Sequence, residues 1–353
     1  MILNIDDEAN QQGRGKMDFQ LKRLWVKKSK KDYQRWEKLL HHAGIRTEEN
    51  VQYTVGLFDG EKLIGTGSIA DNVLKCLAVC KDYTGGGAIN QLVSHLMNLV
   101  FEKGETACYV YTKPAATLSF QHLGFKEIAR VEELVFMEKA SFGFESYLQA
   151  LSQSIVEGDR IAGIVMNANP FTKGHQYLIE AAAKENDWVH VFVLSEDVSV
   201  FPATDRKKLV QKGIQHLDNV SIHDTKSYLV SSATFPSYFL TENSDVTQIQ
   251  AKLDATIFRD SIAPTLNIHF RYVGEEPCSE ATRIYNEAMT EVFDHHIQLI
   301  ILSRKETDGE VISASRVRAL LAANKLKEIK PLVPQTTFDY LKTQKGKEIQ
   351  LKL

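Results

Sequence analysis

A proline, a glycine and a histidine lie together between an apolar run and an amphipathic stretch. The segment NANPFTKGHQYLIEAAAK follows IAGIVM, so Gly174 and His175 fall at the expected start of a helix directly after a buried strand. A helix N-terminus presents unpaired N–H groups and a positive dipole end, which together bind anions. His175 adds an imidazole, Thr172 adds a hydroxyl, and Gly174 lets the backbone approach a ligand closely. The segment predicts a phosphate site; a helix start whose histidine packs or faces water is the alternative.

A second segment with the chemistry of an anion site lies far downstream. In ISASRVRALLAANK, which begins at Ile312, we expect Ser313 or Ser315 to cap a helix that carries Arg316 and Arg318 in its first turns. Cations near a helix N-terminus oppose its dipole, so an anion nearby is expected to offset that cost. Two such helix starts, facing each other, would clamp a polyphosphate from both sides.

The second half of the chain has the pattern that brings such helix starts together. Short apolar runs alternate with helical patterns, and the runs are IAGIVMN, WVHVFVLS, VSIHD, NIHFRYVG and IQLIILS. This alternation predicts a parallel sheet covered on both faces, wound as a Rossmann-like doubly wound α/β domain. Ligands of such sheets bind beyond the carboxyl ends of the strands, where NPFTKGH lies.

The first half predicts a different, α+β arrangement. Strand-like runs flank the turn signal Asp59-Gly60, which indicates a hairpin, and VLKCLAVC follows as another strand. A helical pattern over AINQLVSHLMNLVF comes next, followed by the strand ACYVYT, a short helix and a last strand, EELVFMEK. Cys76 and Cys80 belong to VLKCLAVC, and we interpret them as free thiols rather than zinc ligands.

The composition and net charge of the chain limit the classes of protein to which it can belong. The 353 residues are 43% hydrophobic and 25% charged, which is typical of a globular chain long enough for two domains. A formal net charge of -3 gives no basic excess of the kind that nucleic-acid binding requires. No apolar run reaches the length of a membrane span, and the polar N-terminus lacks the features of a signal peptide. We therefore expect a cytoplasmic protein with neither nucleic acid nor membrane as partner.

The two phosphate segments also carry a family resemblance. TKGH paired with ISASRVR resembles the signature of the nucleotidyltransferase superfamily, with Thr172 where a first histidine is common and Ser315 where threonine is usual. Together with FPATDRKKLV and YVGEEPCSEATRIYNEAM, these motifs are similar to those of citrate lyase ligases, over nearly the whole chain. That family joins a GNAT acetyltransferase-like N-terminal domain to a nucleotidyltransferase domain. The resemblance places these domains at residues 1–142 and 159–353, with a linking helix at 143–158.

The resemblance implies a specific reaction. Acetate attacks the α-phosphorus of ATP, which carries Mg²⁺, and pyrophosphate leaves. The acetyl group of the resulting acetyl-adenylate then passes to the thiol prosthetic group of the citrate lyase acyl carrier (gamma) subunit, and AMP is released. Such adenylyl transfer needs positioning and charge stabilisation more than covalent help from the protein.

Residue roles follow from matching the motifs position by position. His175 and Thr172 are assigned to the α-phosphate, and Ser313, Ser315 and Arg318 to the β- and γ-phosphates. The remaining ATP-binding candidates shape the turn or end a neighbouring strand or helix at the same face: Asn169, Phe171, Gly174, Arg206 and Gly274. For Arg206, an exposed helix arginine beside Lys207 and Lys208 is an equally supported interpretation.

The first half contains a weaker signal. VCKDYTGGGAINQL resembles the acyl-CoA loop of the GNAT fold, with Gly85 and Gly87 at the glycine positions. Thr84 and Ile89 depart from that pattern, so we expect the loop to hold the CoA-like arm of the carrier rather than to turn over acetyl-CoA; a ligand-free scaffold is the alternative. The basic run WVKKSKKDYQRW is read as a solvated helix start or a docking site for an acidic carrier.

Two other functions remain open from sequence. One is an adenylyltransferase that makes a soluble dinucleotide, of the pantetheine-phosphate or nicotinate-nucleotide type; such enzymes are usually single small domains. The other is a carrier-binding or regulatory protein that uses both folds only for binding. The N-terminal half of the chain argues against the adenylyltransferase, and the intact pair of His175 and Arg318 argues against the binding protein.

Overall fold

The computed structural model describes residues 19–84, 87–197, 199–229, 235, 238, 240, 245–275, 280–307 and 309–353. The chain divides into two compact units. The first unit consists of residues 1–127, 134–141 and 236–242, and the second of residues 128–133, 142–235 and 243–353. The expected linking helix corresponds to α4 (Phe144–Ser152), which ends earlier than 158 and belongs to the second unit through its buried Phe144, Tyr147 and Leu151.

The first unit is built on a mixed sheet. Within the described residues this sheet has the order β1-β2-β3-β4-β5-β7-β6. β4 and β5 are parallel, whereas β1 and β2, β2 and β3, β3 and β4, and β5 and β7 are antiparallel. The strands are β1 (Gln20–Leu24), β2 (Tyr53–Asp59), β3 (Lys62–Ala70), β4 (Val73–Val79), β5 (Ala107–Thr112), β6 (Lys126–Arg130) and β7 (Val135–Ala140). The predicted hairpin at Asp59-Gly60 is confirmed, because β2 and β3 pair up to Asp59 and Lys62.

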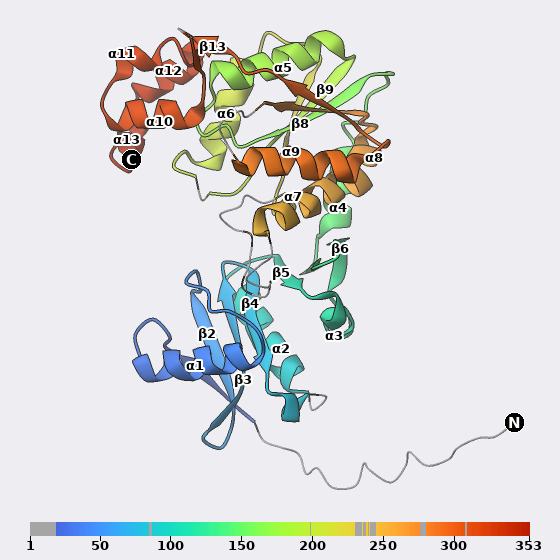
Figure 1. Ribbon diagram of the computed structural model, residues 1–353, viewed down its shortest axis with the longest axis vertical. Helices are drawn as coiled ribbons and strands as arrows, with labels where there is room; N and C mark the ends of the chain where they lie inside the picture. The colour runs from blue at the N-terminus through green and yellow to red at the C-terminus, as the bar shows by residue number, and fades with distance from the viewer. Residues whose placement is uncertain are drawn as a thin grey trace, which may run out of the picture. The chain divides into compact units, whose positions relative to one another are not determined.

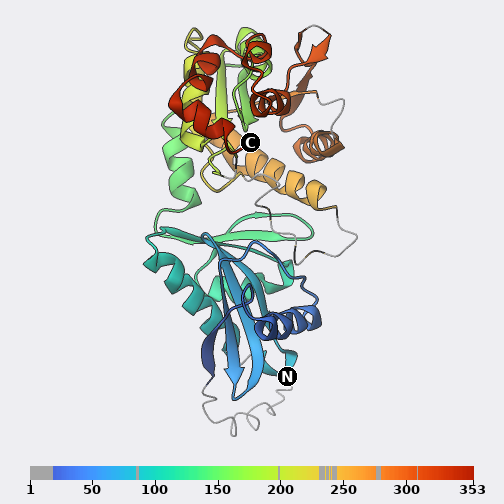
Figure 2. The same cartoon turned by 90° about the vertical axis from the view of Figure 1, so that its left-hand side faces the viewer.

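Helices cover both faces of this sheet, as Figure 2 shows for α1 and α2. They are α1 (Lys30–His42), η1 (Lys81–Tyr83), α2 (Ala88–Glu102), η2 (Pro114–Ala116) and α3 (Thr117–His122). The apolar stripe of α2 is buried in the main core with residues of β2 to β5, as its helical spacing requires. Only Val73 and Leu74 of β4 are in register with β5, so the two strands are unpaired beyond that point, where a cavity opens.

The second unit contains the predicted parallel sheet. Its strand order is β10-β9-β8-β11-β12, every pair is parallel, and each strand falls on one of the five apolar runs. The strands are β8 (Ile161–Met166), β9 (Trp188–Val193), β10 (Val220–Asp224), β11 (Phe270–Gly274) and β12 (Gln298–Leu302). The chain winds outward from β8 in one direction and then from β11 in the other, so the topological switch point lies between β8 and β11.

Helices lie on both faces of the parallel sheet (Figure 1). α5 (Lys173–Glu185) and α6 (Ala203–Gly213) pack against β8 and β9, while α7 (Val246–Ile257) and α9 (Glu280–Phe293) pack side by side against the opposite face. Between α7 and β11 the chain forms the π-helical η3 (Phe258–Ile262) and α8 (Ala263–Leu266). The predicted α/β fold class is thereby confirmed.

The C-terminal segment forms a helical cluster beside α6. After the short hairpin of β13 (Glu306–Thr307) and β14 (Glu310–Val311) it contains α10 (Ala314–Ala322), α11 (Leu326–Ile329), α12 (Gln335–Leu341) and α13 (Gln344–Gln350). These helices bury their own apolar cluster, which includes Ile312 at the start of the second phosphate segment and Phe201 just before α6. The cluster therefore packs α10 against α11, α12 and α13 and against the segment that precedes α6.

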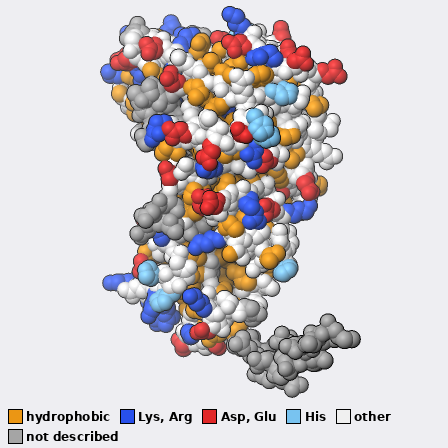
Figure 3. All heavy atoms as spheres, turned by 45° about the vertical axis from the view of Figure 1, so that its right-hand side comes forward, with side chains coloured by type: hydrophobic (Ala, Val, Ile, Leu, Met, Phe, Trp, Pro, Cys, Tyr) orange, Lys and Arg blue, Asp and Glu red, His pale blue; other side chains and the backbone are white. Residues whose placement is uncertain are grey.

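The surface drawn in Figure 3 carries Lys and Arg interspersed with Asp and Glu, without one sign dominating. In the part of the chain that the structure describes, no helix is long and apolar enough to cross a bilayer. Cys76 and Cys108 are buried free thiols and Cys80 is a partly buried one, whereas Cys278 lies outside the described residues.

Candidate active site

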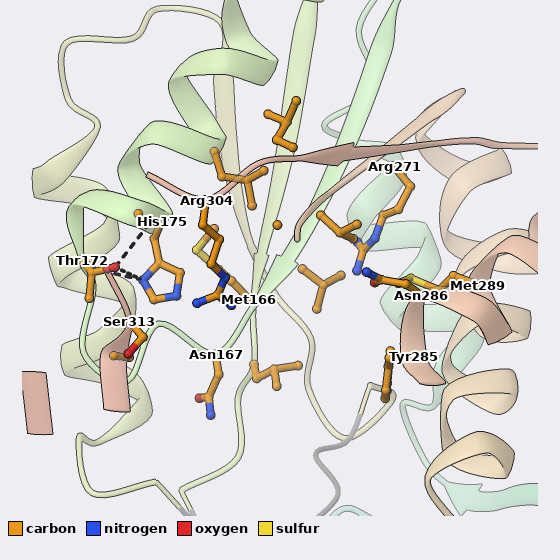
Figure 4. A pocket seen from close by; sticks show the side chains of 18 of the residues that line it. Met166, Asn167, Thr172, His175, Arg271, Tyr285, Asn286, Met289, Arg304 and Ser313 are labelled. Carbon is orange, nitrogen blue, oxygen red and sulfur yellow. Dashed lines mark hydrogen bonds between the residues drawn. The ribbon is translucent and has the colours of Figure 1, made fainter. Parts of the chain in front are cut away.

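A cavity of about 580 Å³ opens at the switch point of the parallel sheet. It is bounded by the strand ends of β8, β11 and β12, by the first turns of α5 and α10, and by α7 and α9. Figure 4 shows Thr172, His175 and Ser313 on one side and Arg271, Tyr285, Asn286 and Met289 on the other. The two predicted phosphate segments thus meet at one cavity, although Ser313 lies 138 positions after His175 in the sequence.

Thr172 and His175 form a reciprocal cap at the start of α5. The Thr172 hydroxyl accepts from the amide of His175 at 3.3 Å, and the Thr172 amide donates to Nδ1 of His175 at 3.1 Å. Because an amide can only donate, Nδ1 must accept and the ring proton lies on Nε2. Burial, and then the nearby Arg304 cation, lower the pKa of His175 from 6.5 to about 4. At neutral pH His175 is therefore an uncharged imidazole whose Nε2–H is left for a ligand.

This geometry adds to the expected role of Thr172. Its side chain is 1% exposed and is used to cap α5 and to fix the ring of His175. Thr172 also lines the cavity, so its expected contact with the α-phosphate stays a prediction beside these contacts with His175. Phe171 supports the same ring: it is fully buried, lies nearly parallel to His175 at 5.9 Å between ring centroids, and fits against Gly213.

The first turn of α5 has fewer free amide N–H groups for an anion than a helix start would suggest. The Lys173 amide donates to the carbonyl of Leu332, and the His175 amide donates to Thr172. Among the described residues, the amide of Gly174 has no acceptor and lines the cavity. A Cβ at Gly174 would lie 3.1 Å from the carbonyl oxygen of Ile312, so the glycine allows close approach of the second phosphate segment as well as of a ligand.

The second phosphate segment begins α10 at the cavity. Ser313 is the cap, since its hydroxyl accepts from the amide of Arg316 at 3.1 Å. The amides of Ala314 and Ser315 have no acceptor among the described residues, and both residues line the cavity. Arg316 forms an ion pair with Glu310 at 2.5 Å, so the anion that offsets this cation belongs to the protein.

Arg318 connects the two phosphate segments. Its Nη1 donates to the carbonyl of Asn169 at 2.5 Å, and its Nη2 donates to the hydroxyl of Ser315 at 3.0 Å. Asn169 is held in turn, because its side-chain oxygen accepts from the amide of Phe201 at 3.1 Å. Desolvation lowers the pKa of Arg318 from 12.5, and a guanidinium remains charged under those conditions.

The position of Arg206 matches neither of the two interpretations from the sequence, which were an ATP-binding residue and an exposed helix arginine. The side chain is fully buried, and its guanidinium donates to the carbonyls of Phe201, Asn167, Leu194 and Glu196 at 2.5–3.0 Å. It also donates to the side-chain oxygen of Asn167 at 2.8 Å. Arg206 thus joins the loops that follow β8 and β9, and it is neither an exposed helix residue nor directed at the cavity.

Of the remaining candidates, Gly274 lines the cavity at the end of β11, and a Cβ added there would meet no atom within 4 Å. Gly85 lies outside the described residues. Gly87 caps α2 with φ of +79°, a conformation that favours glycine. Thr84 and Ile89, together with residues of β4 and β5, line a cavity of about 350 Å³ in the first unit.

Several cavity residues escaped the sequence reasoning. Arg304 and Lys305 follow β12 directly, so the rule that ligands bind at strand ends would have found them. Arg304 donates from Nε to the carbonyl of Glu275 at 2.5 Å, and burial lowers its pKa. Asn167 follows β8 in the same way. Arg271 had a different signal, since it is a charged residue inside an apolar strand.

No group of three His, Cys, Asp or Glu side chains gathers among the described residues in a way that would hold a metal ion. The residues at the helix starts are instead N–H donors and cations, which suit the oxygens of a triphosphate. A Mg²⁺ ion fits this site as part of the nucleotide, where phosphate and water oxygens complete its coordination.

Known proteins show similarity over most of the chain. Residues 161–341 match the citrate lyase ligase C-terminal domain. The [citrate [pro-3S]-lyase] ligase of Klebsiella pneumoniae is 36% identical over 331 residues, which cover 92% of this chain and 97% of the relative. The same-named protein of Escherichia coli K12 is 38% identical over 309 residues, 86% and 88% of the two chains.

Among solved structures, the ribosomal-protein-S18-alanine N-acetyltransferase of Escherichia coli aligns with 35% of this chain and 93% of its own, at 15% identity and a TM-score of 0.28. The family match covers the whole parallel-sheet unit from β8 to α12, including both phosphate segments and the cavity between them. The relatives extend that match through the first unit. The chain therefore belongs to the citrate lyase ligase family.

Proposed function

We propose that this chain uses ATP to acetylate the thiol prosthetic group of the citrate lyase acyl carrier subunit through an acetyl-adenylate. The supporting observation is the meeting of two helix N-termini, with His175 on one and Ser313 and Ser315 on the other, at one cavity on the switch point. Each helix start contributes amide donors, and Arg304 and Lys305 add positive charge at the same end. Such preorganised donors stabilise the charge that develops on leaving pyrophosphate.

The reaction has two steps in this site. A carboxylate oxygen of acetate attacks the α-phosphorus, the bond from that phosphorus to the bridging oxygen breaks, and pyrophosphate leaves with the electron pair. The thiol sulfur then attacks the acetyl carbonyl carbon, the bond to the AMP oxygen breaks, and the thiol proton passes to solvent. His175 donates from Nε2 to an α-phosphate oxygen in both steps without gaining or losing a proton, since its pKa of about 4 keeps it neutral.

The phosphates occupy the two helix starts. The amides of Gly174, Ala314 and Ser315 and the hydroxyl of Ser313 line the cavity and bind the β- and γ-phosphates. Arg318 is not one of the residues that line the cavity, and it adds its positive charge from beside Ser315. Two of the five N–H groups of Arg318 are engaged by Asn169 and Ser315, which leaves others for a phosphate oxygen. Gly274 leaves open space at the end of β11 for the nucleoside.

Exchange of labelled pyrophosphate into ATP tests the first step. We expect exchange that depends on acetate, and a loss of roughly 100- to 1000-fold in His175→Ala with the fold retained. His295→Ala is the matched control, because His295 is exposed and pairs with the adjacent Asp294. Exchange that needs a phosphorylated nucleophile instead of acetate would identify a dinucleotide-forming adenylyltransferase, and ATP binding without any exchange would identify a binding protein.

We propose further that the cavity of the first unit holds the CoA-like arm of the carrier. Its walls come from β4 and β5 where these strands are unpaired, and α2 begins beside it at Gly87. Titration of the full chain with dephospho-CoA, after a non-hydrolysable ATP analogue has filled the nucleotide site, measures this binding by calorimetry. Absence of heat at millimolar ligand would leave the first unit as a scaffold.

A further inference from the structure

The cavity continues beyond the phosphate end into an inner chamber between the sheet and the helices α7 and α9. We define this inner chamber by Asp254, Phe258, Arg271, Tyr285, Asn286 and Met289, all of which line the cavity. Figure 4 shows four of these residues across the cavity from His175 and Ser313. The roles assigned to the nucleotide phosphates use none of these residues, so the inner chamber is open to a second substrate.

Arg271 is an unusual residue for the place that it occupies. It belongs to β11 and its side chain is 8% exposed, yet its Nε and Nη1 groups have no hydrogen-bond partner among the described residues. The guanidinium lies over the ring of Phe258, 4.5 Å from Cζ to the ring centroid. Stacking covers one face of the guanidinium, but its N–H groups lie in the plane of the group and still need hydrogen-bond acceptors in that plane. A buried cation with unsatisfied donors is costly unless an anion completes it.

The neighbours of Arg271 keep it charged without satisfying those donors. Burial lowers its pKa from 12.5 to about 10, while the nearby Tyr285 and Asp254 act in the opposite direction. The Tyr285 hydroxyl donates to the carboxylate of Asp254, so one oxygen of this acid is already engaged. In Figure 4 the side chain of Asn286 lies next to the guanidinium, and Met289 follows one turn further along α9. The chamber thus presents a cation and an amide beside an apolar wall.

We propose that Arg271 binds the carboxylate of the acid substrate, with Asn286 beside it and the methyl group against Met289. This inference rests on the proposed function, which requires a carboxylate to meet the α-phosphorus at His175. A carboxylate held through both oxygens by the guanidinium fork keeps a lone pair on the oxygen that faces His175, and that oxygen attacks the α-phosphorus. The residue that orients the attacking acid is thereby assigned.

A carboxylate fits these groups better than the other parts of the substrates do. The planar fork of a guanidinium matches the two oxygens of a carboxylate in geometry as well as charge. The phosphates already have donors at the starts of α5 and α10, on the other side of the cavity. An adenine base is uncharged, so Asp254 would remain the one nearby anion among the described residues to offset the buried charge of Arg271.

Steady-state pyrophosphate exchange in Arg271→Gln and Arg271→Lys tests the proposal. We expect the KM for acetate to rise at least about 30-fold in Arg271→Gln, because a buried charge partner is lost. Arg271→Lys keeps the positive charge but not the planar fork, so its KM for acetate should lie between those of the wild type and Arg271→Gln. The KM for ATP should stay within about twofold of the wild-type value, since no phosphate contact changes. Added guanidinium ion should restore part of the activity of Arg271→Ala.

Arg283→Gln is the control, because Arg283 lies on the same helix as Asn286 but is exposed and pairs with Glu287. An increased KM for ATP with that for acetate unchanged would show that the inner chamber holds the nucleotide and would overturn the proposal. Unchanged constants for both substrates would overturn it as well.

Direct binding separates this inference from the proposed function. The probe is ¹³C-labelled acetate, observed by NMR with the full chain and a non-hydrolysable ATP analogue. We expect binding in the wild type and Arg283→Gln and its loss in Arg271→Gln. If the wild type shows no exchange, the proposed function fails, while acetate binding that depends on Arg271 would still support the chamber assignment. Acetate binding that is equal in all three proteins, or absent from the wild type, refutes it.

Discussion

Arg318 donates a hydrogen bond from Nη1 to the main-chain carbonyl of Asn169, 149 positions earlier in the chain, at 2.5 Å. The same guanidinium holds the hydroxyl of Ser315, so one side chain joins the turn after β8 to the start of α10. This arrangement makes Arg318 a positioning residue as well as a candidate phosphate contact, and the two roles respond differently to substitution.

The first prediction concerns this link. Arg318→Lys keeps a positive charge but cannot reach both acceptors, so we expect kcat/KM for ATP to fall by about 10- to 100-fold while the melting temperature changes little. The kcat/KM of Arg318→Gln for ATP should fall further, because this variant loses the positive charge as well. Pyrophosphate exchange and thermal unfolding measure both effects. Equal rates in the lysine variant and the wild type would show that charge alone matters at this position.

The second prediction concerns the support of His175. Gly213→Ala places a Cβ into the ring of Phe171, which lies parallel to His175. Overpacking of this kind typically costs about 1–3 kcal/mol, and displacement of Phe171 should also tilt the imidazole and lower the exchange rate. Gly274→Ala is the control for stability, because its added Cβ meets no atom within 4 Å. An equal loss of unfolding free energy in Gly213→Ala and Gly274→Ala would contradict the packing argument.

The third prediction concerns Arg206. Its replacement by glutamine leaves several buried carbonyl oxygens without donors, so we expect a loss of about 2–5 kcal/mol of unfolding free energy. Lys208→Gln, two positions further along α6, is exposed and should have no measurable effect. Denaturant unfolding decides the matter. A raised KM for ATP with unchanged stability would restore the substrate-binding role that the sequence suggested.

The fourth prediction concerns acid stability. Burial lowers the pKa values of His175, His190 and His223 to about 4, 3 and 4, and His190 contacts His223 at 2.9 Å between Nδ1 and Nε2. Below an ordinary pKa of about 6.5 the unfolded chain takes up protons at these sites while the folded chain does not. The unfolding free energy should therefore be at its full value above pH 6.5 and fall as the pH drops toward 4.

The double variant His190→Leu/His223→Leu checks this cause. It removes two of the three titrating groups, so its unfolding free energy should depend less steeply on pH over the same interval. Urea denaturation at a series of pH values gives the slope for each protein. An unchanged slope in the double variant would assign the acid sensitivity to other groups.

Much of the second unit follows from the sequence alone. Each of the five apolar runs contains a strand of the parallel sheet, and the inner strands β8 and β9 are almost fully buried, as strands covered on both faces require. The sequence predicts both phosphate segments because a strand, a turn and a helix start have local residue signals, such as Pro170 in the turn and Ser313 at the helix cap. The predicted cap is one of these, and the structure selects Ser313 over Ser315.

The parts that the sequence did not reveal depend on contacts between distant segments. Thr172 reads as a ligand-facing hydroxyl, but its partner is the imidazole one turn away. Arg206 reads as a surface residue because its neighbours are lysines, yet carbonyls from two separate loops surround it. The charge of Arg271 inside an apolar run marks that residue in the sequence, but the inner chamber forms only when α7, α9 and β11 come together. Long-range packing, rather than propensity, places these groups.

The position of Arg271 along β11 has a kinetic consequence. It lies three residues before Gly274, inside the strand, whereas the helix starts of α5 and α10 lie beyond the strand ends. An acid bound to Arg271, as proposed, would therefore lie further from the carboxyl edge of the sheet than a triphosphate at the helix starts. Acetate should enter first and ATP second in a compulsory order, which product-inhibition patterns would reveal. The nucleotide itself would then shield the mixed anhydride from water until the thiol arrives.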